Sequence, residues 1–257
     1  MTRKFVRIIF LSAILFLSFF KTAQGFAYSH KKSGLFFGVS GSWDWMSNAG
    51  TAKVPNGSSA SPPSDVDFYT ISKPKSQGNF AFYAGYRFVR LKRFFPSISL
   101  AFRYSHLLHA SVNGTVEQYS LPAFLNYNYT LNFNSDIYTL QAMLELFRLG
   151  LLAPYVSAGI GFANNNIYNY NETAVSGVTP RVSPDFGTNN NFSFVYNIGA
   201  GVNFRITKKL IAALGYEHAN LGKINGVGNG SDWTNQSLSL GTLKTNAVML
   251  GFFYQIT

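Results

Sequence analysis

Residues 191–206 read NFSFVYNIGAGVNFRI, and this stretch decides the class of fold. Large apolar side chains stand at every second position, and small or polar side chains stand between them. Because successive side chains of a strand point to opposite faces, this period of two predicts one long strand with an apolar face. The apolar positions are Phe192, Phe194, Tyr196, Ile198, Ala200, Val202, Phe204 and Ile206.

The same alternation recurs along the chain, and the connections between its segments follow a rule. Long polar connections at about 47–77, 111–134, 164–190 and 221–243 alternate with three short basic ones. An even number of strands with this alternation is typical of an up-and-down barrel whose long loops share one end. We therefore predict an all-β fold, an eight-stranded antiparallel up-and-down barrel. The other seven segments lie at about 35–45, 80–88, 97–104, 138–146, 156–163, 210–218 and 247–256.

The aromatic faces of these strands could point into the barrel or out of it. In a soluble barrel of the lipocalin kind they would point inward, but eight strands enclose only enough space for ordinary side chains. The opposite faces, rich in Gly, Ala and Ser, fit that space. With the aromatic faces outward the surroundings are apolar, and a closed barrel satisfies its backbone groups within lipid. The sequence therefore predicts a transmembrane β-barrel.

The first 25 residues have the pattern of a secretory signal peptide. Arg3, Lys4 and Arg7 precede the apolar run 8–20, and residues 23–25 (Ala-Gln-Gly) suit cleavage by signal peptidase. The alternative is a membrane anchor, but the run is shorter than the roughly 20 apolar residues that span a bilayer. We predict a signal peptide at 1–25, a barrel at 26–257, and export to the outer membrane of a Gram-negative bacterium.

The charge of the chain says more about a membrane than about nucleic acid. The net charge is +11, but only 12% of the residues are charged and 17% are aromatic. Such a composition fits a surface that is half lipid, and no helix or aromatic platform for nucleic acid is apparent. We predict contacts with outer-membrane lipids and lipopolysaccharide, and none with nucleic acid. Apart from those of the signal peptide, many of the basic residues lie at the start of the barrel or at the short turns: Lys31, Lys32, Arg90, Lys92, Arg93, Arg148, Lys208 and Lys209.

Two groups of residues have predicted places in this barrel. Six charges fall on the inward faces, where a balanced network would plug the lumen; the alternative is a path for ions or protons. Aromatic residues near strand ends are expected at the two membrane surfaces. The inward charges are Asp44, Arg87, Arg103, Glu145, Arg205 and Glu217, and the interface aromatics are Trp43, Trp45, Phe94 and Phe95.

Two stretches carry a resemblance to a known family. Gly251, Tyr254 and Ile256 in the closing stretch MLGFFYQIT (249–257) resemble the signal read by the barrel assembly machinery, although the chain ends in Thr257 where that signal usually ends in Phe. Residues 196–224, YNIGAGVNFRITKKLIAALGYEHANLGKI, resemble the strand-turn-strand repeat of the opacity-type and OmpA/OmpX-like porin-family barrels. This resemblance implies a small outer-membrane barrel that the assembly machinery inserts, and it assigns no activity.

Signals for catalysis are weak. His218 resembles the histidine of the His-x-Ser-Asn stretch of the lipid A deacylases, but Ala219 and Asn220 follow it, so no serine nucleophile stands two positions on. His106 and His109 are expected on opposite faces of a strand, which makes them a poor metal pair. We predict that the protein is not an enzyme and has no cofactor and no metal site.

Function is then expected at the long loops, because binding residues concentrate on loops held by a rigid scaffold. We predict a structural or surface-interaction role, either adhesion or envelope integrity, with host or envelope surface molecules as partners. The alternative is a narrow porin-like channel for ions or small solutes. The sequence does not identify the ligand.

Overall fold

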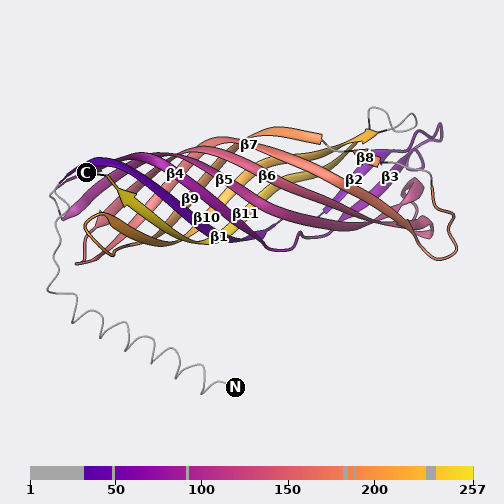
Figure 1. Ribbon diagram of the computed structural model, residues 1–257. Helices are drawn as coiled ribbons and strands as arrows, with labels where there is room; N and C mark the ends of the chain where they lie inside the picture. The colour runs from indigo at the N-terminus through magenta and orange to yellow at the C-terminus, as the bar shows by residue number, and fades with distance from the viewer. Residues whose placement is uncertain are drawn as a thin grey trace, which may run out of the picture.

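The computed structural model describes residues 32–47, 50–90, 93–181, 185–187, 189–229 and 236–256 (Figure 1). The predicted signal peptide at 1–25 and Thr257 lie outside the described residues. Among the described residues, no helix is long and apolar enough to cross a membrane. The strands are β1 (Gly34–Met46), β2 (Gly50–Pro55), β3 (Val66–Ile71), β4 (Gln77–Val89), β5 (Phe94–Glu117), β6 (Leu125–Phe147), β7 (Leu152–Ala174), β8 (Asp185–Gly187), β9 (Asn189–Arg205), β10 (Leu210–Asn229) and β11 (Ser237–Gln255).

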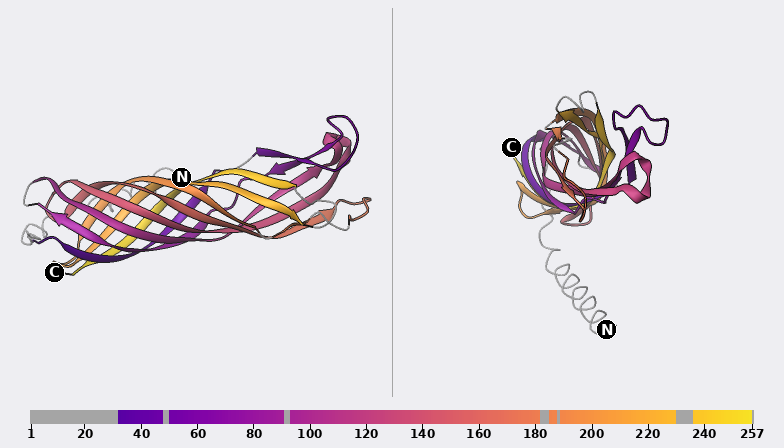
Figure 2. Two further views of the ribbon diagram at one scale, coloured as in Figure 1. Left: turned by 90° about the horizontal axis from the view of Figure 1, so that it is seen from above. Right: turned by 90° about the vertical axis from the view of Figure 1, so that its right-hand side faces the viewer.

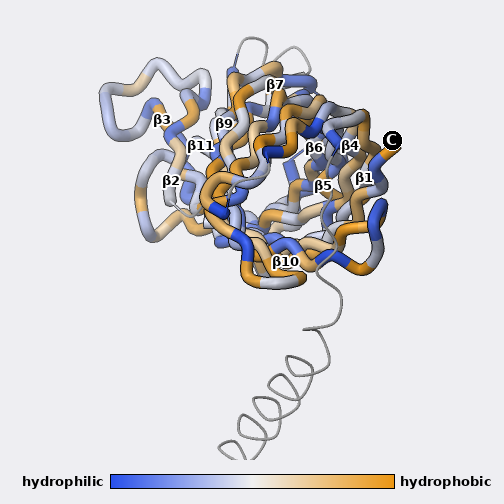
Figure 3. The backbone as a smooth tube through the Cα atoms, turned by 90° about the vertical axis from the view of Figure 1, so that its left-hand side faces the viewer, coloured by the Kyte–Doolittle hydropathy of each residue, from blue (hydrophilic) through white to orange (hydrophobic). Residues whose placement is uncertain are grey.

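Eight of these strands pair in a closed antiparallel ring. The order is β5, β4, β1, β11, β10, β9, β7, β6, and β6 pairs again with β5. The first and last strands of the chain meet in this ring, with Val39 opposite Phe252. Figure 3 views the ring along its axis. The predictions of an all-β fold and of eight antiparallel strands are confirmed, and the closed ring leaves no free strand edge in this region.

The two faces of the ring are sorted as the period of two predicts. Large apolar side chains cover the outside, and Leu140 and Phe162 are 66% and 61% exposed. The six inward charges are all buried. A one-residue register slip would exchange the two faces, so the pairing register and the sidedness are linked.

The long stretches expected as loops contain more strand than predicted. β5 and β6 continue to Glu117 and from Leu125, which leaves only two short 3-10 turns, η2 (Gln118–Ser120) and η3 (Pro122–Phe124), between them. Likewise, β7 enters the 164–190 stretch, β10 and β11 enter 221–243, and the hairpin of β2 and β3 fills much of 47–77. Beyond the apolar band the large apolar side chains point inward instead of outward. Val112, Leu131 and Phe133, for example, are buried inside. Alternation with apolar residues on the outside therefore predicts strands that end too early.

Candidate functional site

The interior of the ring is filled in layers, and the first layer is an ion cluster at the short-turn end. Arg87 donates to one oxygen of Glu145, and Asn203 donates to the same oxygen at 3.0 Å. Arg205 Nη2 donates to the other oxygen, Oε2, at 3.3 Å. Arg148 Nη2 lies 3.9 Å from Oε2, beyond hydrogen-bonding distance. One carboxylate therefore faces three guanidinium groups.

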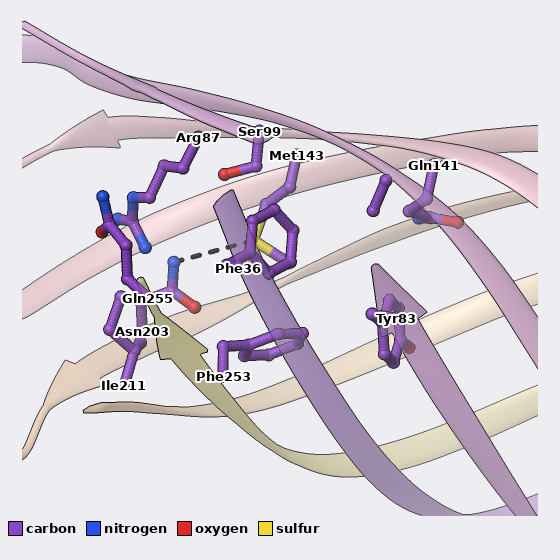
Figure 4. A pocket seen from close by; sticks show the side chains of 11 residues that line it. Phe36, Tyr83, Arg87, Ser99, Gln141, Met143, Asn203, Ile211, Phe253 and Gln255 are labelled. Carbon is purple, nitrogen blue, oxygen red and sulfur yellow. Dashed lines mark hydrogen bonds between the residues drawn. The ribbon is translucent and has the colours of Figure 1, made fainter. Parts of the chain in front are cut away.

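An aromatic layer follows, and glycines make room for it. Phe253 stacks edge-on against Phe36 and Tyr83, with ring centroids 6.0 and 5.2 Å apart. The Tyr155 hydroxyl lies so close to Gly215 that a Cβ there would approach it to 2.2 Å. A cavity of about 30 Å³ remains between these rings (Figure 4). Such a cavity holds one or two waters and is far too small for a solute.

The second ion cluster lies on the other side of the aromatic layer. Arg103 Nη1 donates to both oxygens of Glu217, at 2.8 and 2.7 Å. Asn197 bridges Glu217 at 2.7 Å and the side-chain oxygen of Gln141 at 3.0 Å. Asp44 has its own partners in this cluster: it accepts hydrogen bonds from Ser42 Oγ at 2.5 Å and from Asn79 Nδ2 at 3.2 Å. The structure thus brings the six predicted charges together as two clusters of three and not as one network.

Above the second ion cluster, the outer half of the molecule has an apolar interior. This core packs side chains from the extended parts of the ring strands and from the hairpin of β2 and β3. Its largest fully buried members include Tyr69, Tyr129, Phe133, Phe186, Leu107, Leu131 and Ile167. The core has the alternation of a soluble sheet, with apolar residues inside and polar residues outside.

A polar network centred on Arg181 ties the loop end together. Arg181 pairs with Glu172 at 2.7 Å and with Asp67 at 3.4 Å, and it donates to the Tyr69 hydroxyl at 3.1 Å. Its guanidinium also lies 4.6 Å from the centre of the Tyr127 ring. Burial, aided by the negative charge of Glu172, raises the pKa of Tyr69 above its ordinary value. The network joins β3, β6 and β7, which are distant in the sequence.

The connection between β5 and β6 presents an apolar tip beside this network. The rings of Tyr119 and Phe124 pack edge-to-face, with their centroids 5.8 Å apart. Figure 2 shows this connection and the hairpin of β2 and β3 standing away from the axis of the ring. The exposed apolar side chains of the tip are Tyr119, Leu121, Phe124 and Leu125, which we call the tip patch.

The predicted interface aromatics lie at opposite ends of the outward apolar band. Trp43 and Trp45 are exposed near the loop end of β1, and Phe94 and Phe95 are exposed at the start of β5. In the predicted assembly signal, Gly251 is buried against β1, whereas Tyr254 and Ile256 are exposed on the outside. These positions are compatible with the roles predicted for them and do not test those roles.

The two histidines on β5 correct one expectation. A register shift between Leu107 and Ala110 inserts a bulge, so His106 and His109 both lie on the outer side and not on opposite faces. Each has its own partner: His106 bonds Asp136 at 2.8 Å, and His109 bonds the Tyr168 hydroxyl at 2.6 Å. The described residues hold no group of three or more potential metal ligands.

Sequence reasoning missed three functional candidates. Arg181 and Asp67 fall within the long connections expected at 164–190 and 47–77, and nothing in the sequence indicates that β3 reaches the end of β7. Arg148 was treated as a rim cation, although it turns toward Glu145. Alternation in stretches such as 127–133, with its buried Tyr127, Tyr129, Leu131 and Phe133, was a signal that could have revealed the outer core.

Comparisons with known proteins cover most of the chain. The family model described as outer membrane protein beta-barrel domain matches residues 13–255. Among curated proteins there is no match. Neisserial surface protein A is similar in structure, with 11% identity over 88% of this chain and 100% of its own, and a TM-score of 0.45. OprG from Pseudomonas aeruginosa has 12% identity over 88% and 97%, with a TM-score of 0.47. Ail of Yersinia pestis has 11% identity over 88% and 99%, with a TM-score of 0.37.

Proposed function

We propose that this chain, which belongs to the outer membrane protein beta-barrel family, is a plugged transmembrane barrel. Its loop end then binds partners at the cell surface. The apolar band on the outside of the ring supports the membrane-spanning part of this proposal. The aromatic residues at both ends of that band support its two boundaries. On this reading the short turns face the periplasm, and no enzymatic step is involved.

The closed interior is the observation that carries the proposal. A solute moving along the axis meets the Glu145 cluster, the aromatic layer, the Arg103–Glu217 cluster and then the apolar core. The cavities within the aromatic layer and the Arg103–Glu217 cluster measure about 30 and 10 Å³. Opening such a path means separating buried ion pairs and displacing packed aromatic rings, and both are costly. This favours a structural or binding role over a channel.

The tip patch is the surface best prepared to bind a partner. Tyr119 and Ser120 both have a φ of 56°, a conformation that is costly for residues other than glycine. Surrounding bonds hold this conformation: Tyr119 N donates to Asp67 Oδ1 and Ser120 Oγ donates to Val66 O, each at 3.0 Å. A surface fixed in advance loses little entropy on binding, and exposed aromatic residues are frequent at interfaces. We infer that it contacts an apolar surface on a host or envelope molecule.

Two measurements test this function. In single-channel recordings of the refolded protein, we expect no discrete steps, and the Arg103→Ala and Glu145→Ala variants are recorded beside it. For binding, bacteria that produce the wild type are compared with a Phe124→Ser variant for adherence to host cells and for envelope leakage. A Lys75→Ser variant is the control, because Lys75 is an exposed residue outside the tip patch.

The outcomes separate the two roles. Loss of adherence or of envelope integrity in Phe124→Ser but not in Lys75→Ser supports a surface role through the tip patch. Conductance steps in the wild type that grow in the charge variants mean that the lumen conducts and that the channel role is correct. If the wild type shows no conductance steps and Phe124→Ser matches it in adherence and envelope leakage, binding through this patch is refuted.

A further inference from the structure

The ion cluster at the short-turn end has more positive charge than its carboxylate neutralises. Glu145 accepts bonds from Arg87 and Asn203 on one oxygen and from Arg205 on the other. Arg148 approaches the same carboxylate without bonding it. Three guanidinium groups and one carboxylate leave two positive charges over. The other two acidic residues among the six predicted inward charges, Asp44 and Glu217, belong to the cluster beyond the aromatic layer.

Two of these arginines have hydrogen-bond donors to spare. Arg205 is only 3% exposed, yet within the described part of the chain its Nε and Nη1 have no hydrogen-bond partner. The Nε and Nη2 atoms of Arg148 are likewise buried without a partner among the described residues. An unpaired buried charge is destabilising, because burial removes its hydration without supplying a partner. Four donor atoms on two neighbouring side chains therefore call for an acceptor.

The place of these donors decides how an acceptor would reach them. Arg205 ends β9, and Arg148 directly follows β6, so both stand at the end of the ring with the short turns. The Arg148 side chain is 21% exposed and forms the outer side of the cluster. Figure 4 shows Arg87, Asn203 and Gln255 together at one end of the aromatic cavity. A ligand that enters from this end meets Arg148 first and Arg205 behind it.

We propose that Arg148 and Arg205 form an anion site for a phosphate group at the short-turn end. Guanidinium groups bind phosphate through several N–H donors at once, and a phosphate has enough oxygens for two arginines together. A group with two negative charges would balance the two positive charges left by Glu145, and a phosphodiester with one negative charge would halve them. The phosphate can belong to an anionic phospholipid headgroup or be free inorganic phosphate. The site is separate from the tip patch, so it does not depend on what the loop end binds.

The test uses the chain without its predicted signal peptide, residues 26–257, refolded in phosphate-free, uncharged detergent. Thermal unfolding is followed by circular dichroism while inorganic phosphate is added, with chloride as the ionic-strength control. The same chain is then placed in nanodiscs of phosphatidylcholine alone or with phosphatidylglycerol. Arg148→Gln and Arg205→Gln remove the proposed donors. Arg90→Gln is the matched control, because Arg90 is an exposed cation at the same end of the ring.

We expect phosphate to raise the melting temperature of the wild type saturably and chloride not to do so. Losing a hydrogen bond to a charged group weakens binding at least about tenfold, so Arg148→Gln should need that much more phosphate, and Arg90→Gln should match the wild type. Arg148 is partly exposed, so this variant is informative even if Arg205→Gln does not fold. Stabilisation by phosphatidylglycerol alone identifies a lipid headgroup as the source. No stabilisation by either, or equal losses in Arg90→Gln, overturns the proposal.

Discussion

Replacing Arg103 by methionine is the sharpest test of the plugged interior. Arg103 and Glu217 are 5% and 8% exposed and share two hydrogen bonds. Methionine has a similar length but leaves Glu217 buried with Asn197 as its remaining partner. Because the carboxylate is then uncompensated, we expect a loss of about 3–5 kcal/mol in the free energy of unfolding.

The double variant Arg103→Met/Glu217→Met should recover most of that loss. It removes both charges, and Asn197 can still donate to Gln141 at 3.0 Å. Replacing a buried ion pair by apolar residues of similar volume is often neutral, so we expect the double variant to lie within about 1 kcal/mol of the wild type. Each single variant should therefore be less stable than the double variant, with a large coupling energy between the two sites.

Urea unfolding in lipid vesicles, followed by tryptophan fluorescence, measures these free energies. Trp43 and Trp45 lie on the outside of the ring, so their emission reports its insertion. Glu217→Gln serves as a milder control, because its amide oxygen still accepts a bond from Arg103. If the two single losses simply add in the double variant, the two groups do not act as a buried pair. Water then reaches the lumen, and the plugged interior is wrong.

Three further predictions concern the packing and the loop end. Gly215→Ala places a Cβ 2.2 Å from the Tyr155 hydroxyl and should cost about 1–3 kcal/mol in the same urea assay, whereas Gly41→Ala, with no atom within 4 Å, should be neutral. Arg181→Ala should speed proteolytic cleavage at the loop end while leaving the ring intact, because Asp67 and Glu172 lose their shared partner; an unchanged cleavage pattern contradicts this role. Folding raises the pKa of Tyr69. The stability that Tyr69 contributes to the loop end is therefore complete below the unfolded-state pKa of about 10, and it is lost as the pH rises through the folded-state pKa. Limited proteolysis across alkaline pH should therefore show the loop end loosening, and Tyr69→Phe should shift this onset upward.

The sequence by itself determined the parts of this protein that follow from local periodicity. A period of two marked all eight ring strands, and volume alone assigned the aromatic face to the outside. The inward position of charges such as Arg103 and Glu217 followed from the same parity. These inferences succeed because a strand alternates its faces strictly, so one residue placed correctly places its neighbours.

Only the tertiary structure decided which of these residues meet. Arg103 and Glu217 are 114 positions apart, and nothing local indicates that they pair while Glu145 collects Arg87, Arg205 and Arg148. The sequence did not reveal the apolar core of the outer half for a related reason. Within the apolar band the large apolar side chains of the strands point outward, but beyond it they point inward, so the same alternation there indicates a core. Pairing and surroundings depend on how the ring closes, which is a property of the whole chain and not of any one segment.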